Sequence, residues 1–220
     1  MPSNTYPFIA REGWHLLVIL AALALLVYVF FGFSFVFPEI IIICFFVYLL
    51  RDPPRTVPSI PLGLVSPIHG KVISIMSIDD PWISRKATRI RMQMSVFDIY
   101  SLRSPIEGKV MNEWALSPCE EYPDRNFVFW IKTDEGDDVV MEIHLNLITA
   151  PIFRFYIQTG ERVGQGQRCG FLYLGGLVDV WVPENCNINV ETGSKILAGS
   201  DIIAKLIHNE GVTAIPQTSI

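Results

Sequence analysis

The sequence predicts a mostly β fold, with a duplicated hammerhead or barrel-sandwich-like domain that follows an N-terminal membrane helical hairpin. Three observations lead to this prediction. One long apolar segment is confined to residues 15–50, a heptapeptide occurs twice, and short alternating strands are separated by glycine turns. The first observation indicates membrane-associated helices, and the other two indicate a small duplicated β domain.

The apolar segment is too long for one straight span. Its 36 residues contain a single formal charge, Glu39. As one helix it would measure about 54 Å, against a hydrocarbon core of about 30 Å. Pro38 and Glu39 divide it into residues 15–37, long enough to span, and residues 40–50, too short to span. We therefore expect a helical hairpin, or one span with a re-entrant segment, that turns near Pro38 within the membrane.

Basic residues flank this segment on both sides. Arg11 precedes it, Arg51 and Arg55 follow it, and no basic residue lies between them. The positive-inside bias then predicts the cell (inner) membrane, with the β domain on the cytoplasmic side. A cleavable signal peptide is the competing interpretation, but the apolar stretch is too long and no small-x-small site follows it. The expected units are 1–50 (hairpin), 51–65 (proline-rich linker), 66–208 (β domain) and 209–220 (flexible tail).

Two pairs of repeats predict a duplicated β domain. The heptapeptide SPIHGKV at 66–72 recurs as SPIEGKV at 104–110, and 160–172 shares a Gly-x-x-apolar-x-x-Gly pattern with 193–206. Both patterns resemble those of lipoyl and biotinyl carrier domains, which are built from two interlocked hammerhead strands. The carriers' modified lysine has no counterpart on an exposed hairpin, because Lys71 and Lys109 lie in the repeated turns. The resemblance therefore implies the architecture without the carrier function.

Composition narrows the range of partners. The net charge is −5, without a basic stripe or zinc-ligand spacing, so we expect no nucleic-acid partner and no metal. The four cysteines form no CxxC pair, which favours free thiols in a reducing compartment.

Motifs along most of the chain resemble those of the short, single-domain bacterial and archaeal phosphatidylserine decarboxylases. The segments that carry the resemblance are 11-REG-13, 51-RDPPR-55, 66-SPIHGKV-72, 89-RIRMQMSVFDIYSLRSPIEG-108, 160-GERVGQGQRCGFLYLGGLVDVWVP-183 and 193-GSKILAGSDIIA-204. In that family a serine in Gly-Ser-Arg cleaves the chain and becomes a pyruvoyl group. This group holds the substrate amine as a Schiff base and accepts electrons as carbon dioxide leaves. A histidine and an aspartate assist the proton transfers.

This sequence departs from the family pattern at the reacting positions. The Gly-Ser pair falls on Gly175 and Gly176, the histidine on Tyr100, and the aspartate of Ser-Pro-x-Asp-Gly on His69. A single serine-to-glycine change would fit an engineered trap of the precursor, whereas several losses together fit a natural paralogue. We therefore expect no pyruvoyl cofactor.

The predicted function is that of a membrane-bound, catalytically impaired family member that binds phospholipid or regulates an active paralogue, or forms a homo-oligomer. One alternative is an active decarboxylase that makes phosphatidylethanolamine by an unorthodox maturation. A second alternative is a membrane-tethered carrier-like interaction module.

Several other residues are candidates for the site. Asp98, beside the degenerate histidine position, is a candidate base or head-group contact, and His144 shares a strand face with Glu142. Each also has a purely structural interpretation, as a polar residue at a strand end and as a hydrogen-bonded core histidine. The candidates for contact with a lipid phosphate are the arginines Arg103, Arg125 and Arg154.

Overall fold

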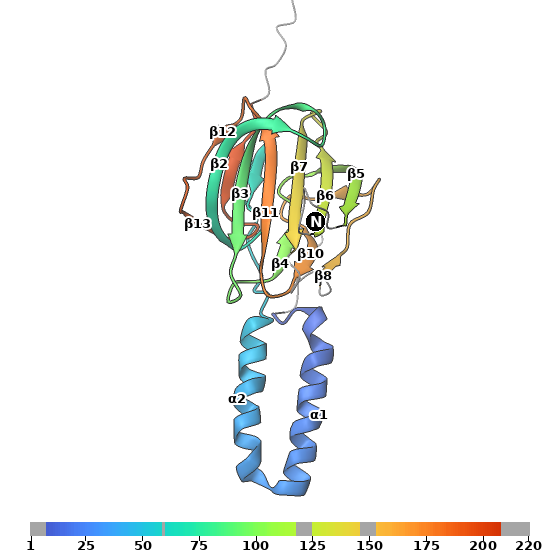
Figure 1. The fold of residues 1–220 in the computed structure, drawn as a ribbon, viewed down its shortest axis with the longest axis vertical. Coiled ribbons are helices and arrows are strands. Elements are labelled where there is room, and N and C mark those ends of the chain that lie inside the picture. Colours follow the sequence, from blue (N-terminus) through green and yellow to red (C-terminus); the bar gives the residue numbers. More distant parts are fainter. Residues whose placement is uncertain (1–7, 59, 118–124, 146–152, 208–220) are drawn as a thin grey trace, which may run out of the picture.

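A helical hairpin projects from one end of a β domain (Figure 1). The computed structural model describes residues 8–58, 60–117, 125–145 and 153–207. A short 3-10 helix, η1 (Arg11–Gly13), leads into α1 (Trp14–Phe31), which is followed by α2 (Phe33–Leu49). The mostly β prediction is confirmed, because every regular element of the described chain after Leu49 is a strand.

The hairpin turns at Gly32, and the prediction of a turn near Pro38 is wrong. Gly32 has φ 81° and ψ 176°, a conformation that glycine adopts without a Cβ penalty. Pro38 instead lies inside α2. With the turn at Gly32, both helices measure about 26–27 Å, close to the thickness of a hydrocarbon core. The segment Arg11–Phe31 is long and apolar enough to cross a membrane, with mean hydropathy 2.5.

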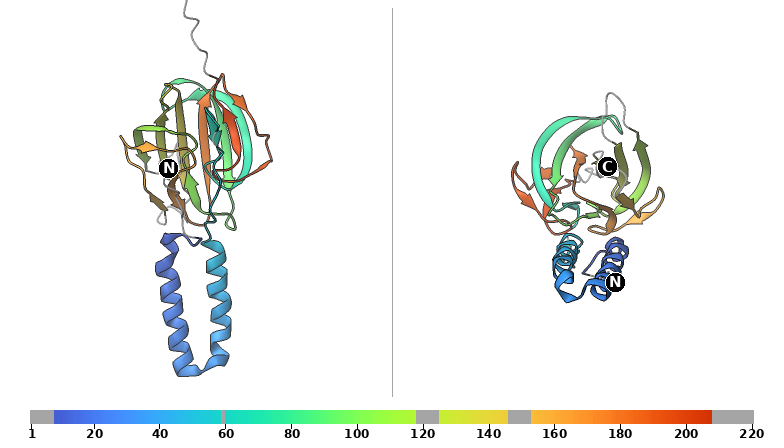
Figure 2. Two further views of the ribbon diagram at one scale, coloured as in Figure 1. Left: turned by 180° about the vertical axis from the view of Figure 1, so that it is seen from behind. Right: turned by 60° about the horizontal axis from the view of Figure 1, so that its bottom comes forward.

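The strands of the β domain are β1 (Gly63–Val65), β2 (Gly70–Asp80), β3 (Arg85–Met94), β4 (Ser101–Arg103), β5 (Gly108–Leu116), β6 (Arg125–Lys132), β7 (Asp138–Leu145), β8 (Phe153–Phe155), β9 (Arg162–Val163), β10 (Arg168–Leu172), β11 (Gly176–Pro183), β12 (Asn187–Ile188), β13 (Lys195–Ile196) and β14 (Ile202–Lys205). The main sheet has the order β13-β2-β3-β11-β7-β6-β5-β9 and curls around the domain (Figure 2). Two three-stranded sheets, β1-β14-β12 and β4-β10-β8, complete it. The core contains the apolar residues of alternating positions, such as Met141, Ile143, Val178 and Val180.

The two copies of the heptapeptide have the same local structure. The Ser66 hydroxyl donates to the carbonyl of Ile68 (2.7 Å), and the Ser104 hydroxyl donates to that of Ile106 (2.8 Å). Each copy leads into a strand, β2 or β5, and each strand carries an irregularity two residues after the heptapeptide's glycine. Local sequence therefore encodes the same turn and bulge twice.

The second pair of repeats closes each half in the same way. Gly193 donates to the carbonyl of Val72 and Gly160 to that of Val110, both at 2.8 Å, and both glycines have φ 93°. The halves also interlock, because Val65 donates to Pro105 (2.8 Å) and Arg103 donates to Pro67 (2.9 Å) through their backbones. The matching hydrogen bonds show that the two halves of the β domain are related by an approximate internal duplication.

Buried ion pairs attach the hairpin to the β domain. Glu12, before α1, pairs with Arg168 of β10 at 2.7 Å. Asp52, after α2, pairs with Arg103 at 3.5 Å and with Arg168 at 3.6 Å. We call these residues the junction. Of the segment expected to be linker, residues 63–65 form β1, and the tail expected at 209–220 lies outside the described residues.

Candidate functional site

Gly175 ends the turn between β10 and β11, Gly176 is the first residue of β11, and their backbones have different requirements. Gly175 has φ 103°, and a Cβ there would lie 2.7 Å from the carbonyl oxygen of Met94. At Gly176 a Cβ would meet nothing closer than Leu172 Cδ1 at 3.6 Å. The fold therefore needs glycine at the first position, whereas the second has room for a side chain.

Gly176 lines a pocket of about 780 Å³ at the end of β11. The chain brings His69, Asp98 and His144 to the same pocket from three separate segments. The full lining also includes Gly70, Lys71, Gln93, Met94, Ser95, Val96, Leu174, Leu177 and Lys195. A smaller pocket of about 370 Å³, beside Leu62 and Glu107, brings none of the candidate site residues together.

His69 and Asp98 form a pair inside this pocket. His69 Nε2 lies 3.5 Å from Asp98 Oδ1, while Asp98 Oδ2 accepts the backbone N–H of Ser95 at 2.7 Å. Burial lowers the pKa of His69, and the positive charges of Arg55 and Arg51 lower it further, although Asp98 opposes them. His69 Nδ1 is buried without a hydrogen-bond partner.

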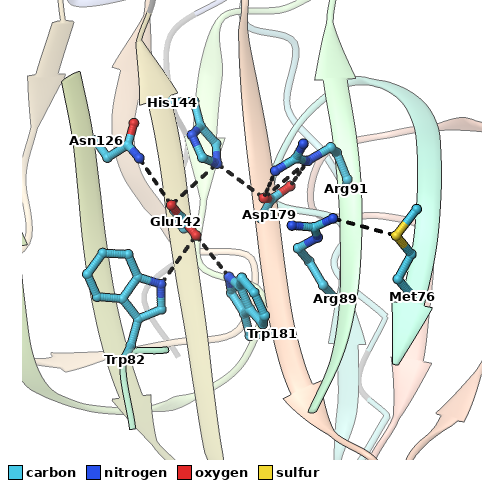
Figure 3. A network of polar contacts seen from close by, with 9 residues as sticks. All are labelled: Met76, Trp82, Arg89, Arg91, Asn126, Glu142, His144, Asp179 and Trp181. Atoms are coloured by element: carbon cyan, nitrogen blue, oxygen red, sulfur yellow. Dashed lines mark hydrogen bonds and ion pairs between the residues drawn. The ribbon is translucent and has the colours of Figure 1, made fainter. Parts of the chain in front are cut away.

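His144 bridges two buried carboxylates on the sheet (Figure 3). Its Nε2 lies 3.1 Å from Asp179 Oδ2 and 3.5 Å from Glu142 Oε1. Register explains the contact, because Leu177 of β11 pairs with His144 and Asp179 pairs with Glu142. The structure therefore brings together His144 and Glu142, as their spacing predicts, and adds Asp179.

The carboxylates of this network are well satisfied. Asp179 forms a bidentate pair with Arg91, at 2.6 to 3.2 Å. Burial favours a raised pKa for Asp179, but hydrogen bonds from Arg91 and His144 outweigh it and the pKa is lowered. Glu142 accepts from Trp82 (3.2 Å), Trp181 (3.1 Å) and Asn126 (3.2 Å), and burial raises its pKa.

A metal ion is a poor fit to this cluster. One ligand atom from each of Glu142, His144 and Asp179 lies within 4.8 Å of the others. The arginine and indole donors already occupy the carboxylate oxygens, and the guanidinium of Arg91 would compete with a cation. The arrangement is that of a hydrogen-bonded ion network on the wall of the pocket.

Comparison with known proteins places the chain in a family. The family model described as Phosphatidylserine decarboxylase matches residues 122–204. A phosphatidylserine decarboxylase proenzyme of Nitrosomonas europaea is 33% identical over 212 residues, which cover 93% of this chain and 98% of that protein. One of Aromatoleum aromaticum is 34% identical over 215 residues, with 93% and 99% covered. The chain belongs to the phosphatidylserine decarboxylase family.

Among solved structures, glucose permease IIA from Mycoplasma capricolum aligns with a TM-score of 0.42 and 14% identity. The alignment covers 65% of this chain and 94% of that one. This likeness is too low to support an argument.

At the position of the decarboxylase histidine, Tyr100 has a packing role. Its ring is buried and meets Phe171 edge-on, with centroids 5.8 Å apart. Its hydroxyl donates to the carbonyl of Val96, and burial raises the pKa of the phenol. Tyr100 is not among the residues that line the pocket.

The three arginine candidates lie in different environments. Arg103 is buried in the junction beside Asp52, so it holds the hairpin and does not face the surface. Arg154 is exposed on β8. Arg125 begins β6, where its backbone pairs with Leu145.

Sequence reasoning missed two lysines of the decarboxylase-family pocket. Lys71 on β2 and Lys195 on β13 are direct partners in the strand register, and both line the pocket. Only the pairing of β2 with β13 brings the two lysines together, and no local sequence pattern predicts it. Neither has an ion-pair partner among the described residues.

Proposed function

We propose that this chain is a membrane-attached member of the phosphatidylserine decarboxylase family that does not process itself. It binds an anionic phospholipid head group and acts as a lipid-binding or regulatory paralogue. The observation that carries the proposal is Gly176, which lines the pocket at the position of the family serine but has no hydroxyl or β-carbon. The chain is attached with both hairpin ends and the β domain on the cytoplasmic side, since Arg11, Arg51 and Arg55 flank the helices.

The residues present do not fit a pyruvoyl group. Its methyl carbon comes from the β-carbon of a serine, and its formation begins when the serine hydroxyl attacks the preceding peptide carbonyl; Gly176 has neither the β-carbon nor the hydroxyl. Cys169, the nearest thiol before the turn, is fully buried and its pKa is raised to about 12 by burial, so it is no substitute nucleophile. His69 and Tyr100 also replace the two residues that assist proton transfer in the family.

The pocket retains groups suited to an anionic head group. Lys71 and Lys195 line the pocket from neighbouring strands and supply two ammonium groups. Asp98 supplies a carboxylate that can accept from an ammonium group of the ligand. A head group that carries both a phosphate and an ammonium group, such as that of phosphatidylserine, offers both charges.

Processing is tested by the integrity of the chain. The purified protein should remain a single band near 24.9 kDa on a denaturing gel after prolonged incubation. Gly176→Ser should also stay intact, because His69 and Tyr100 are unchanged. A triple variant, His69→Asp with Tyr100→His and Gly176→Ser, should release a fragment that starts at residue 176. Two chains in the unmodified protein would instead support an active decarboxylase.

Head-group binding is tested by a matched pair of lysine variants. Lys71→Gln should weaken retention of phosphatidylserine in detergent by several-fold, and by about tenfold when combined with Lys195→Gln. Lys109 occupies the same place in the second heptapeptide but does not line the pocket, so Lys109→Gln is the control. Equal binding by all three variants would exclude this pocket as the lipid site. Co-purification with an active decarboxylase would test the regulatory role.

A further inference from the structure

Three exposed apolar side chains surround the mouth of the pocket. Phe97 is 58% exposed, Val96 is 45% exposed and Leu174 is 38% exposed. Val96 and Leu174 line the pocket, and Phe97 lies next to Val96 in the same loop. We call these three residues the lip. Apolar residues gathered at one opening indicate a surface that meets an apolar partner.

The lip is rigidly constructed. Ser95 and Asp98 enclose Val96 and Phe97 in a turn, because Ser95 N–H donates to the Asp98 carboxylate and Asp98 N–H donates to the Ser95 carbonyl (3.1 Å). Leu174 adopts φ 63°, in the left-handed region that leucine rarely visits. The backbone therefore holds these apolar side chains toward the solvent, although apolar side chains are usually buried in the core.

The lip lies at the end of the β domain from which the hairpin projects. The turn after β3 and the turn before β11 are both at that end (Figures 1 and 2). Contacts of Arg51 show that the lip lies beside the end of α2. Its Nη2 donates to the Phe97 carbonyl (3.2 Å), and its guanidinium lies 4.0 Å from the centre of the Tyr48 ring. One side chain thus connects the lip to the last turn of α2.

Exposed tyrosine and tryptophan side chains lie where both helices meet the β domain. Tyr48 is 50% exposed and Trp14, at the start of α1, is 55% exposed. Tyr156 is 43% exposed, and its hydroxyl bonds to Glu12, two residues before Trp14. Tyrosine and tryptophan are enriched at membrane–water interfaces, where the ring is apolar and the polar atom is hydrated.

We infer that the lip inserts into the interfacial layer of the lipid bilayer, so that the pocket opens onto head groups rather than bulk water. The hairpin would hold the domain at the membrane, while the lip sets its orientation. A head group could then enter the pocket sideways, with its acyl chains still in the bilayer. The inference rests on the membrane attachment in the proposed function, but not on the lack of processing.

The test measures the depth of probes on the full chain in nanodiscs of phosphatidylethanolamine and phosphatidylglycerol. A cysteine-free background receives one cysteine, labelled with an environment-sensitive fluorophore, at Phe97 or Val96. Val29→Cys in α1 reports the hairpin, and Ile78→Cys on β2, 38% exposed, reports a site on the sheet away from the lip. Nitroxide groups on the acyl chains quench inserted probes, and aqueous iodide quenches exposed ones.

The expected result is nitroxide quenching at Phe97 and Val96 about twofold or more above that at Ile78, with reduced iodide quenching. Lip probes that behave like Ile78 while Val29 is quenched would overturn the inference and leave the membrane attachment intact. If Val29 is also unquenched, both the inference and the proposed attachment fail. Should Phe97→Cys misfold, Val96→Cys and Leu174→Cys provide the same reading.

Discussion

At the residue scale, the adjacent glycines Gly175 and Gly176 differ in whether the fold requires glycine at their position. Gly175 is required by its positive φ and by the nearby Met94 carbonyl, so it serves the fold. Gly176 has neither constraint, so no packing reason explains the absence of a side chain there. The fold would therefore accept a side chain at position 176, including the serine of the family pattern.

This difference predicts the effect of adding one methyl group. Gly175→Ala should lower the free energy of unfolding by about 1–3 kcal/mol, because alanine would be strained at φ 103° and would crowd the Met94 carbonyl. Gly176→Ala should change it by less than about 0.5 kcal/mol. Thermal unfolding of both variants in the same detergent measures the difference. Equal losses would show that the turn tolerates neither side chain.

Sequence motifs predict which positions correspond to the reacting residues of the family, because each position falls within a contiguous, recognisable stretch, and these assignments stay predictions. They gave no account of the environment of Arg103, which the motif places next to a surface turn but which the fold buries against Asp52. Lys71 and Lys195 are separated by most of the domain, and only the pairing of β2 with β13 brings them together. Such long-range register is not readable from local pattern.

At the element scale, repeated local patterns were the most informative signal. Ser66 and Ser104 make the same bond because the heptapeptide specifies its own turn. The hairpin shows the opposite case, since the sequence pattern predicts a break near Pro38, whereas the chain turns at Gly32. Pro38 is the sixth residue of α2 and removes one backbone hydrogen bond without ending the helix, whereas a glycine can reverse the chain at once.

The hydrogen-bonded network around Glu142 predicts that the stability difference between the unmodified chain and Glu142→Gln depends on pH. Burial raises the pKa of Glu142 above its ordinary value of 4.5, so the folded state binds this proton more tightly than the unfolded state. Its stabilising contribution is complete below about pH 4.5 and is lost as the pH rises through the raised pKa. Glu142→Gln should therefore gain stability relative to the unmodified chain as the pH increases from about 4 to about 8.

Unfolding by urea at both pH values measures this effect. Asp179, whose pKa is lowered, loses its contribution as the pH falls, but it is present in both chains and largely cancels in the comparison. A glutamine can still accept from Trp82 and Trp181, and Asn126 can turn its unpaired oxygen toward the new amide. A difference in stability that is constant with pH would contradict the burial argument.

At the scale of the whole molecule, the site and the membrane segment are parts of one arrangement. The hairpin ends lie at the same end of the domain as the turns after β3 and before β11 (Figure 1), and residues of these two turns form the lip and line part of the pocket. The apolar segment and the family motifs could be read from the sequence, but this convergence could not. This convergence depends on the curl of the main sheet and on the ion pairs of the junction.

The junction predicts that hairpin and domain are rigidly coupled. Glu12 and Arg168 form a pair whose side chains are 6% and 5% exposed, and removing one partner of a buried pair leaves an uncompensated charge. Glu12→Gln should lower the free energy of unfolding by about 1.5–3 kcal/mol, because it removes a hydrogen bond between charged groups while Asp52, 3.6 Å from Arg168, still compensates part of the arginine charge. Arg168→Gln should do the same, and the double variant should lose less than the sum, because neither charge is then unpaired.

An exposed pair provides the matched control. Arg162 and Asp134 also join an arginine to a carboxylate, but their side chains are 61% and 62% exposed. Asp134→Asn should change stability by less than about 1 kcal/mol, since water screens such a pair. Melting temperatures of the four variants test the prediction, together with limited proteolysis of the segment after Asp52, which should accelerate only in the Glu12 and Arg168 variants. If Glu12→Gln behaves like Asp134→Asn, the pair of Glu12 and Arg168 does not fix the hairpin to the domain, and the pair of Asp52 and Arg103 or the lip must set the orientation of the pocket.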